Sequence, residues 1–125
     1  TSTFFGALNN LIKSLLSAYP GKPVLVCTPM QSKEAYTENV ADPLAALLAK
    51  GDGDKLTLQL RAEAIRAKCR QYGVPCLDLF NASGINGVDA SGVYYRSGDS
   101  LHPSAAGQLR LASLIQAELE KLFTV

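Results

Sequence analysis

Two short apolar runs, PVLVCTP at residues 23–29 and VPCLDLF at residues 74–80, constrain the fold of this chain most strongly. Each run lies between turn-forming residues and is apolar on both faces, which is typical of parallel strands covered by helices on both sides. Helical apolar periodicity occurs before, between and after them. Strands that alternate with helices indicate parallel βαβ units with right-handed crossovers. The sequence therefore predicts an α/β protein.

Four helices are predicted around these strands from stripes of apolar residues and from helix-capping residues. Asp42, Asp54 and Ser104 are suitable N-caps, and Gly73 is a suitable residue to end a helix. The last helix is expected to place Leu111, Ile115, Leu119 and Leu122 on its inner face. The predicted helices cover residues 3–19, 42–51 and 54–72 and a last segment that begins after Ser104.

The sheet predicted in this way is small for the helices around it. A two-stranded parallel sheet is a poor independent core, and strands this apolar expect neighbours on their edges. The 125 residues form at most one domain, and the first residue is Thr1 rather than Met. We therefore expect residues 1–125 to be part of a larger α/β sheet, completed by an upstream segment or by a partner chain.

Composition excludes several classes of function. The net charge is +1 and neither Lys nor Arg forms a cluster, which gives no basis for binding nucleic acid or an anionic membrane. No apolar run is long enough for a membrane span. Cys27, Cys69 and Cys76 lack C-x-x-C spacing and are predicted to be small buried hydrophobes. Metal ligands at suitable spacing and a phosphate-binding glycine loop are also absent, so we expect no metal and no cofactor. The cellular compartment stays open.

The strongest chemical signal is a D-x-x-H pattern formed by Asp99 and His102, the only histidine of the chain. A turn can bring the Asp99 carboxylate to the Nδ1–H group of the imidazole and so fix its tautomer and orientation. Pro103 stiffens the exit from this turn, and Ser104 starts a helix that anchors it. An oriented imidazole at the end of a long loop is how a general base is presented.

The letters GDSL contain Ser100 and suggest that this serine is the nucleophile. A nucleophile on this type of fold should leave a buried strand and enter a helix, whereas Ser100 follows the polar segment SGVYYRSG. It also lies only two residues before His102, which leaves little room for a third catalytic group. We interpret Ser100 as a spacer between Asp99 and His102.

The chain resembles the C-terminal half of an SGNH, or GDSL-type, ester hydrolase. The resemblance covers nearly the whole chain and rests on VLVCTPM after a helix, on the YGVPCLDLF strand, and above all on DSLHPSAAGQLRLA. It implies that His102 is the catalytic base and that Asp99 is the acid that orients it. It also implies a three-layer α/β/α sandwich with a flavodoxin-like parallel sheet, in which the two runs are the fourth and fifth strands.

The nucleophilic Ser and the oxyanion-hole Gly and Asn of that family precede these blocks, and none of the three has a match here. The segment GALNN at residues 6–10 is predicted to be helical, with Asn9 and Asn10 as exposed polar positions. The resemblance therefore implies that this chain holds half of a catalytic triad. An upstream segment or another chain would supply the rest.

Three further features, covering six positions, have two interpretations each. Asp78 lies near the site at the end of a strand, or accepts hydrogen bonds from the loop that follows. Tyr94 and Tyr95 line a substrate pocket, for example for sugar rings, or pack the loop onto the body, which we favour. Residues 28–30 lie near a ligand-binding edge of the sheet, or simply end a strand.

Two functions follow from this reading. The first is an ester hydrolase acting by acyl transfer, in which an external Ser attacks and His102 moves the proton while Asp99 holds the imidazolium. Its substrates would be small esters or acylated glycans. The second is a non-catalytic structural or binding module of the same fold within a larger assembly. The residues upstream of Thr1 would distinguish the two.

Overall fold

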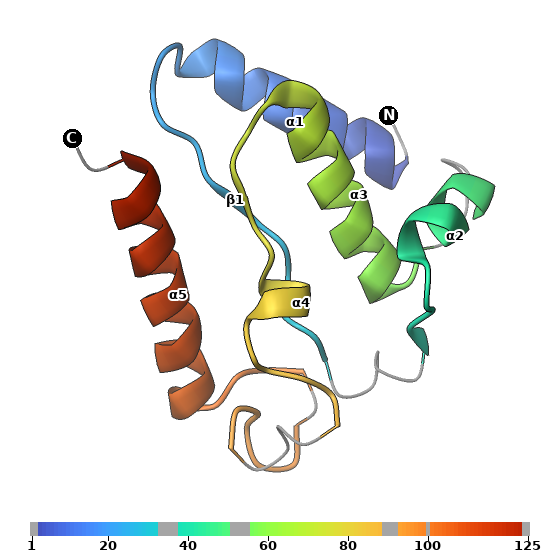
Figure 1. Cartoon of the computed structure of the whole chain (residues 1–125), viewed down its shortest axis with the longest axis vertical. Helices are drawn as coiled ribbons and strands as arrows, with labels where there is room; N and C mark the ends of the chain where they lie inside the picture. Colours follow the sequence, from blue (N-terminus) through green and yellow to red (C-terminus); the bar gives the residue numbers. More distant parts are fainter. Residues whose placement is uncertain (1–2, 33–37, 51–55, 89–92, 100, 124–125) are drawn as a thin grey trace.

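The computed structural model describes residues 3–32, 38–50, 56–88, 93–99 and 101–123. In the view of Figure 1 the two strands run through the middle of the molecule, with α3 on one side of them and α5 on the other. The elements in chain order are α1 (Phe4–Ala18), β1 (Val26–Cys27), α2 (Pro43–Lys50), α3 (Leu58–Tyr72), β2 (Cys76–Leu77), α4 (Leu79–Ala82) and α5 (Ala105–Phe123).

The two strands pair in parallel, as the sequence predicts. Val26 lies opposite Cys76, and Cys27 lies opposite Leu77. The N–H of Val26 donates to the Pro75 carbonyl at 3.1 Å. Each strand has two residues and is shorter than its apolar run. All of these strand residues are only partly buried. The described residues thus form a mixed α/β structure with a two-stranded parallel sheet and mostly helices.

The helix ends are set by local capping. The Asp42 carboxylate accepts from the N–H of Ala45 at 3.0 Å, so Asp42 caps α2 as predicted. Gly73 ends α3 in the left-handed conformation, with φ +66°, also as predicted. The predicted start of this helix at Asp54 is wrong, because α3 begins at Leu58 with the Thr57 hydroxyl as its N-cap. Asp54 itself lies outside the described residues.

The second apolar run does not stay extended to its end. Asp78 caps α4, and its carboxylate accepts from the Asn81 N–H at 3.1 Å, so Leu79 and Phe80 are helical rather than part of the strand. An aspartate three residues before an available N–H is a good N-cap, and this local signal competes with the apolar pattern. The sequence-based prediction of a strand through Phe80 is therefore wrong at its last two residues.

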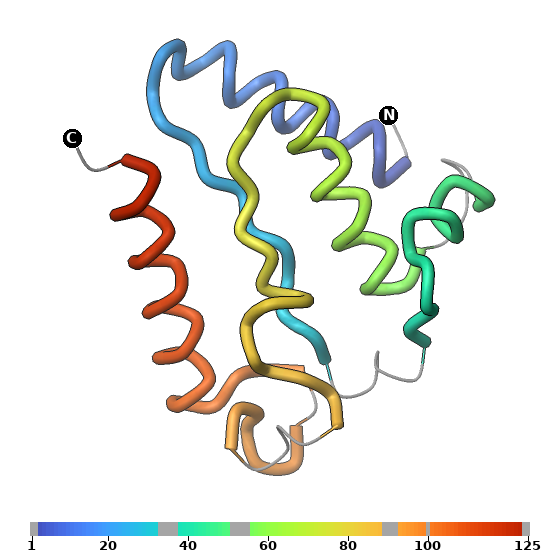
Figure 2. Tube along the Cα trace, viewed as in Figure 1, coloured from blue at the N-terminus to red at the C-terminus, as the bar shows by residue number. Residues whose placement is uncertain are grey.

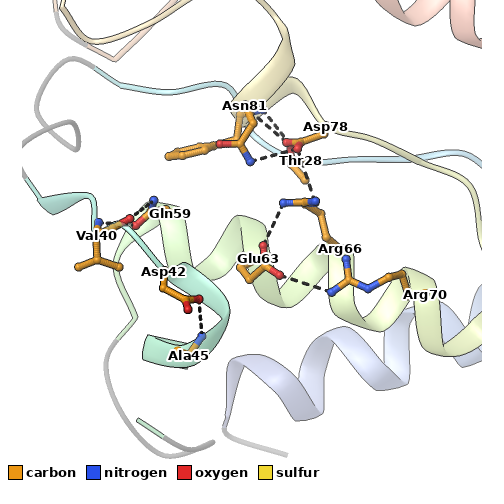
Figure 3. Close-up of polar contacts among 11 residues, drawn as sticks. Thr28, Val40, Asp42, Ala45, Gln59, Glu63, Arg66, Arg70, Asp78 and Asn81 are labelled. Carbon is orange, nitrogen blue, oxygen red and sulfur yellow. Dashed lines mark hydrogen bonds and ion pairs between the residues drawn. The ribbon is translucent and has the colours of Figure 1, made fainter. Parts of the chain in front are cut away.

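The core lies between α1, α2 and α3. Leu8 and Ile12 of α1 pack with Cys69 of α3 and with Val74. A second cluster joins α2 to α3 through Leu47, Leu56, Leu60 and Ala64. The loop before α2 is tied to α3 by two hydrogen bonds between Gln59 and the backbone of Val40, which Figure 3 shows. This side of the molecule is well packed.

The helix α5 is much more open. Gly107 is its only buried position among the described residues. Leu111, Ile115 and Leu122 are half-buried on the predicted inner face. Leu119 is 42% exposed, so the expectation that it faces inward is wrong.

No helix in the described ranges is long and apolar enough to cross a membrane.

The three cysteines are free thiols. Cys69 is buried, as predicted, whereas Cys27 and Cys76 are half-buried. Burial raises the pKa of all three thiols, and it raises that of Cys76 to about 12 with a further contribution from the neighbouring Cys69. Thiols with raised pKa values hold little reactive thiolate at neutral pH, so these side chains act mainly as packing residues.

Candidate functional site

The segment that carries Asp99 and His102 folds back on itself as a short hairpin beside the N-terminal end of α5, as the trace in Figure 2 shows. Its base is closed by an isolated antiparallel bridge between Tyr95 and Pro103. The Ser104 N–H donates to the Tyr94 carbonyl at 2.8 Å, and the Ser104 hydroxyl donates to the Val93 carbonyl. We call the described residues 93–99 and 101–104 the site hairpin.

The inner part of the site hairpin is held by its own backbone. The N–H of Arg96 donates to the His102 carbonyl at 3.0 Å, and the N–H of Asp99 donates to the Arg96 carbonyl at 3.0 Å. The Asp99 carboxylate oxygen Oδ1 accepts from the backbone N–H of Leu101 at 2.7 Å and of His102 at 2.9 Å. One carboxylate oxygen therefore fixes the turn.

The other carboxylate oxygen of Asp99 engages the imidazole. Asp99 Oδ2 lies 2.7 Å from His102 Nδ1. The predicted D-x-x-H contact is therefore present in the structure. Hydrogen bonds from the backbone N–H groups of His102 and Leu101, together with the imidazole, lower the pKa of Asp99 from 3.8 to about 2. The carboxylate is thus ionised at neutral pH and accepts from Nδ1–H.

This geometry leaves Nε2 as the nitrogen that can exchange a proton with a reacting group. The His102 side chain is 59% exposed and that of Asp99 is 29% exposed. An exposed imidazole whose Nδ1 is held by a carboxylate has a fixed tautomer and a fixed orientation. The pair can accept a proton from a nucleophile that approaches from outside the hairpin.

The site hairpin is joined to α5 by a tight contact. The Ser104 side chain accepts from the Gly107 N–H at 3.1 Å, and the Ser104 carbonyl accepts from the Gln108 N–H at 2.8 Å, so Ser104 caps α5 as predicted. A Cβ on Gly107 would overlap with the Tyr94 carbonyl oxygen and lie 3.0 Å from Pro103 Cβ. The glycine of the D-x-x-H-P-x-x-x-G block thus lets the helix approach the hairpin closely.

Ser100 lies outside the described residues, so the structure does not test its interpretation as a spacer. Within the described ranges, no group of three His, Cys, Asp or Glu side chains is arranged to hold a metal ion.

The residues at the ends of the two strands form a structural network, which Figure 3 shows. The Thr28 side chain is 2% exposed; its hydroxyl donates to Asp78 at 3.3 Å and accepts from the Phe80 N–H at 3.0 Å. The Asp78 carboxylate also accepts from the Asn81 side chain at 3.0 Å. Asp78 accepts hydrogen bonds from the segment that follows it, as one of its two interpretations predicts, but that segment is the helical turn α4 rather than a loop. Thr28 ties the end of β1 to the start of α4.

A buried carboxylate on α3 was not predicted from the sequence. Glu63 is 6% exposed and forms ion pairs with Arg66 at 3.0 Å and Arg70 at 3.4 Å. Arg66 also lies 3.5 Å from Asp78, and Figure 3 shows it between the two carboxylates. The arginines at positions three and seven residues after Glu63 were the available signal, because these spacings return to the same helix face. This cluster links α3 to the end of β2.

Two other sequence-based expectations can be compared with the structure. Tyr95 is 2% exposed and packs with Ile85, which confirms that it holds the loop on the body. Asn10 is exposed as predicted, but the expectation that Asn9 is exposed is wrong. Asn9 is half-buried and accepts a hydrogen bond from the Tyr72 hydroxyl. Its partner lies 63 residues away on α3.

Comparisons with known proteins give similar structures but no matching family or curated sequence. No protein-family model matches the chain. No curated protein sequence matches it either. Two crystal structures are similar at 27% identity: one with a TM-score of 0.69 over 95% of this chain, and one, a protein from Lactobacillus plantarum, with a TM-score of 0.71 over 96%.

The chain spans about half the length of these two proteins, namely 52% and 54%. A salicylyl-acyltransferase from a tetracycline biosynthetic pathway is similar over 98% of this chain and 33% of its own, with a TM-score of 0.63 and 20% identity. At that identity the likeness concerns the fold alone. The described α/β arrangement thus occurs within larger proteins.

Proposed function

We propose that the chain is the Asp- and His-bearing part of an ester hydrolase that uses a Ser-His-Asp triad. One observation carries the proposal: His102 Nδ1 lies 2.7 Å from Asp99 Oδ2, while two backbone N–H groups hold the other oxygen of the same carboxylate. A carboxylate fixed on both oxygens orients the imidazole without itself taking up the proton.

The proposed chemistry is acyl transfer to water. The Ser hydroxyl attacks the ester carbonyl while His102 Nε2 takes its proton, which gives a tetrahedral intermediate and an imidazolium next to Asp99. The imidazolium then returns the proton to the leaving alcohol. Water attacks the acyl-enzyme in the same way and releases the acid. Small O-acyl esters and acylated glycans are the proposed substrates.

The nucleophile is proposed to come from a complementary segment that completes a three-layer α/β/α sandwich of the SGNH type. Two features support this. The β1 and β2 residues and the inner face of α5 are only partly buried, although they are apolar. The similar crystal structures are also about twice as long as this chain. A further strand and its helix would cover this apolar surface.

The test is an esterase assay on the complete natural polypeptide with p-nitrophenyl acetate. His102→Ala should lower kcat by roughly 10⁴- to 10⁶-fold, and Asp99→Asn by about 10⁴-fold, because both remove the oriented base. Gln108→Ala, an exposed position on α5, serves as the control. Unchanged turnover in His102→Ala would end this mechanism, whereas a wild-type polypeptide without turnover would favour the non-catalytic binding module.

A further inference from the structure

Tyr95 connects the site hairpin to the body of the protein. Its ring is buried against Ile85, and Met30, Tyr94 and Leu111 pack against these two side chains. Its hydroxyl donates to the carbonyl oxygen of Gln31 at 2.7 Å. The two residues are 64 positions apart in the sequence. A buried phenol that is hydrogen-bonded at its far end is held at two points, which fixes both its ring and the backbone that carries it.

The acceptor of this bond lies in the segment that follows β1. Gln31 comes four residues after Cys27, the last residue of that strand. Its side-chain oxygen accepts from the Gly87 N–H at 3.2 Å. Gln31 therefore joins three segments: its backbone holds the site hairpin, its side chain holds the loop after α4, and it continues directly from β1.

We propose that Tyr95 is a positioning residue, whose hydroxyl bond to Gln31 fixes the site hairpin, with Asp99 and His102, at the carboxyl end of β1. This inference rests on the proposed function, since the position of the hairpin affects a reaction only if His102 takes part in it. Ligands and reacting groups of parallel α/β sheets lie at the carboxyl ends of the strands. Tyr95 thus acts through the place of the imidazole and touches no reacting atom.

Two sets of contacts have different tasks: one holds Asp99 next to His102, and the other holds the site hairpin on the body. Asp99 and His102 are held together by contacts inside the site hairpin, so their mutual geometry does not need Tyr95. The position of the whole hairpin relative to β1 does depend on contacts with the body. A misplacement of about 1 Å at a reacting group can cost about 100-fold in rate. Burial raises the pKa of the Tyr95 phenol, so it remains a hydrogen-bond donor across the neutral range.

The central test is Tyr95→Phe, which keeps the ring and removes the hydroxyl. In the esterase assay we expect kcat to fall by about 10- to 100-fold with KM unchanged, because substrate binding does not use this bond. The matched control is Tyr72→Phe, which also removes a hydroxyl bond, to Asn9, but between α1 and α3. It should lose similar thermal stability and keep its kcat. Equal kcat values for Tyr95→Phe and the wild type would overturn the proposal.

Nuclear magnetic resonance separates a shift of the hairpin from damage to the pair. The hydrogen-bonded Nδ1 proton of His102 should remain visible in Tyr95→Phe and disappear in Asp99→Asn. Slow conformational exchange should appear at the amides of residues 93–99 in Tyr95→Phe only. Loss of the Nδ1 proton in Tyr95→Phe would show that Tyr95 supports the pair itself, which contradicts the positioning role.

A rescue completes the experiment. Tyr95→4-aminophenylalanine restores a donor to the Gln31 carbonyl and should recover most of the lost kcat; failure to recover would contradict the hydrogen bond as the cause. An inactive wild-type polypeptide would refute the proposed function instead. In that case, unchanged amide dynamics in Tyr95→Phe would also refute the idea that Tyr95 fixes the site hairpin. Conformational exchange confined to the site hairpin would support it.

Discussion

The helices α1 and α5 differ sharply in how they are packed, although both carry an apolar stripe. Leu8 and Ile12 of α1 are buried in the core, with Ile12 only 2% exposed. On α5 the corresponding positions, such as Ile115, are half-buried, and Leu109 is 70% exposed. Leu111 packs against the small cluster around Tyr95. In Figure 1 the packed side, with α3, and the open side, with α5, lie on opposite sides of the two strands.

This difference separates the part of the chain that forms most of the core from the part that carries the proposed site. The packed side is held by interlocking apolar side chains from α1, α2 and α3. The open side is held by the small cluster around Ile85 and Tyr95 and by polar contacts, such as the Arg110 Nε bond to the Ser83 carbonyl at 2.8 Å. The site hairpin belongs to the open side. An apolar stripe without full cover is what an incomplete sheet would leave.

The largest expected effect separates the two helices directly. Ile12→Ala should lower the free energy of unfolding by roughly 2–5 kcal/mol, because a buried isoleucine leaves a cavity. Ile115→Ala on α5 should cost only about 1 kcal/mol, since part of its surface is already exposed to water. Chemical denaturation measures both variants. Equal costs would contradict the comparison, and a complementary segment that covers α5 should raise the cost of Ile115→Ala.

The junction between α5 and the site hairpin is the next test. Gly107→Ala places a Cβ against the Tyr94 carbonyl and should cost about 1–3 kcal/mol. In an ordinary helix the same change stabilises by about 1 kcal/mol, so the sign of the effect is diagnostic. Ala106→Gly, at an exposed neighbouring position, is the control and should follow the ordinary helix propensity. Thermal unfolding decides between the two signs.

On the packed side, removal of the α3 cap should have a smaller effect. Thr57→Ala removes the hydroxyl that accepts from the Leu60 N–H and should cost about 1 kcal/mol. Thr57→Ser retains the acceptor and should remain near the wild type in the same denaturation experiment. A neutral Thr57→Ala would mean that the helix does not depend on this cap.

The smallest expected effect is confined to the site hairpin and depends on pH. The pKa of Asp99 is about 2 in the folded chain, below its ordinary value of 3.8. The ionised carboxylate therefore stabilises the hairpin fully at pH values above the ordinary pKa of Asp99. This stabilisation is lost as the pH falls through the pKa of the folded chain. Amide signals of Leu101 and His102 should shift in this acidic range while those of α1 do not. Coincident shifts throughout the chain would contradict this.

Several parts of the structure were predictable because their signals are local. The parallel pairing of the two runs followed from their apolar character, and the caps at Asp42, Gly73 and Ser104 followed from residue type and position. The contact between Asp99 and His102 followed from their spacing of three residues. The caps and the contact between Asp99 and His102 need only neighbours in the sequence, whereas the pairing joins two distant runs whose apolar character is local.

The remainder depends on contacts that a single sequence does not display. The partner of Asn9 is Tyr72, and that of Tyr95 is Gln31, each more than 60 residues away. Glu63 of α3 is buried, which the sequence did not predict, although its arginine partners are close in sequence. The helical turn after Asp78 was missed because the apolar pattern was given more weight than the capping signal.

The local character of the site hairpin has a consequence for folding. Its hydrogen bonds join residues no more than 11 positions apart, as between Val93 and Ser104. The Tyr95 hydroxyl bond to Gln31, which attaches it to the body, spans 64 residues. Because closing a short loop costs less entropy than closing a long one, local contacts tend to form first. We expect the contact between Asp99 and His102 to form early in folding, and the finished hairpin to dock onto the body when the long-range contacts close.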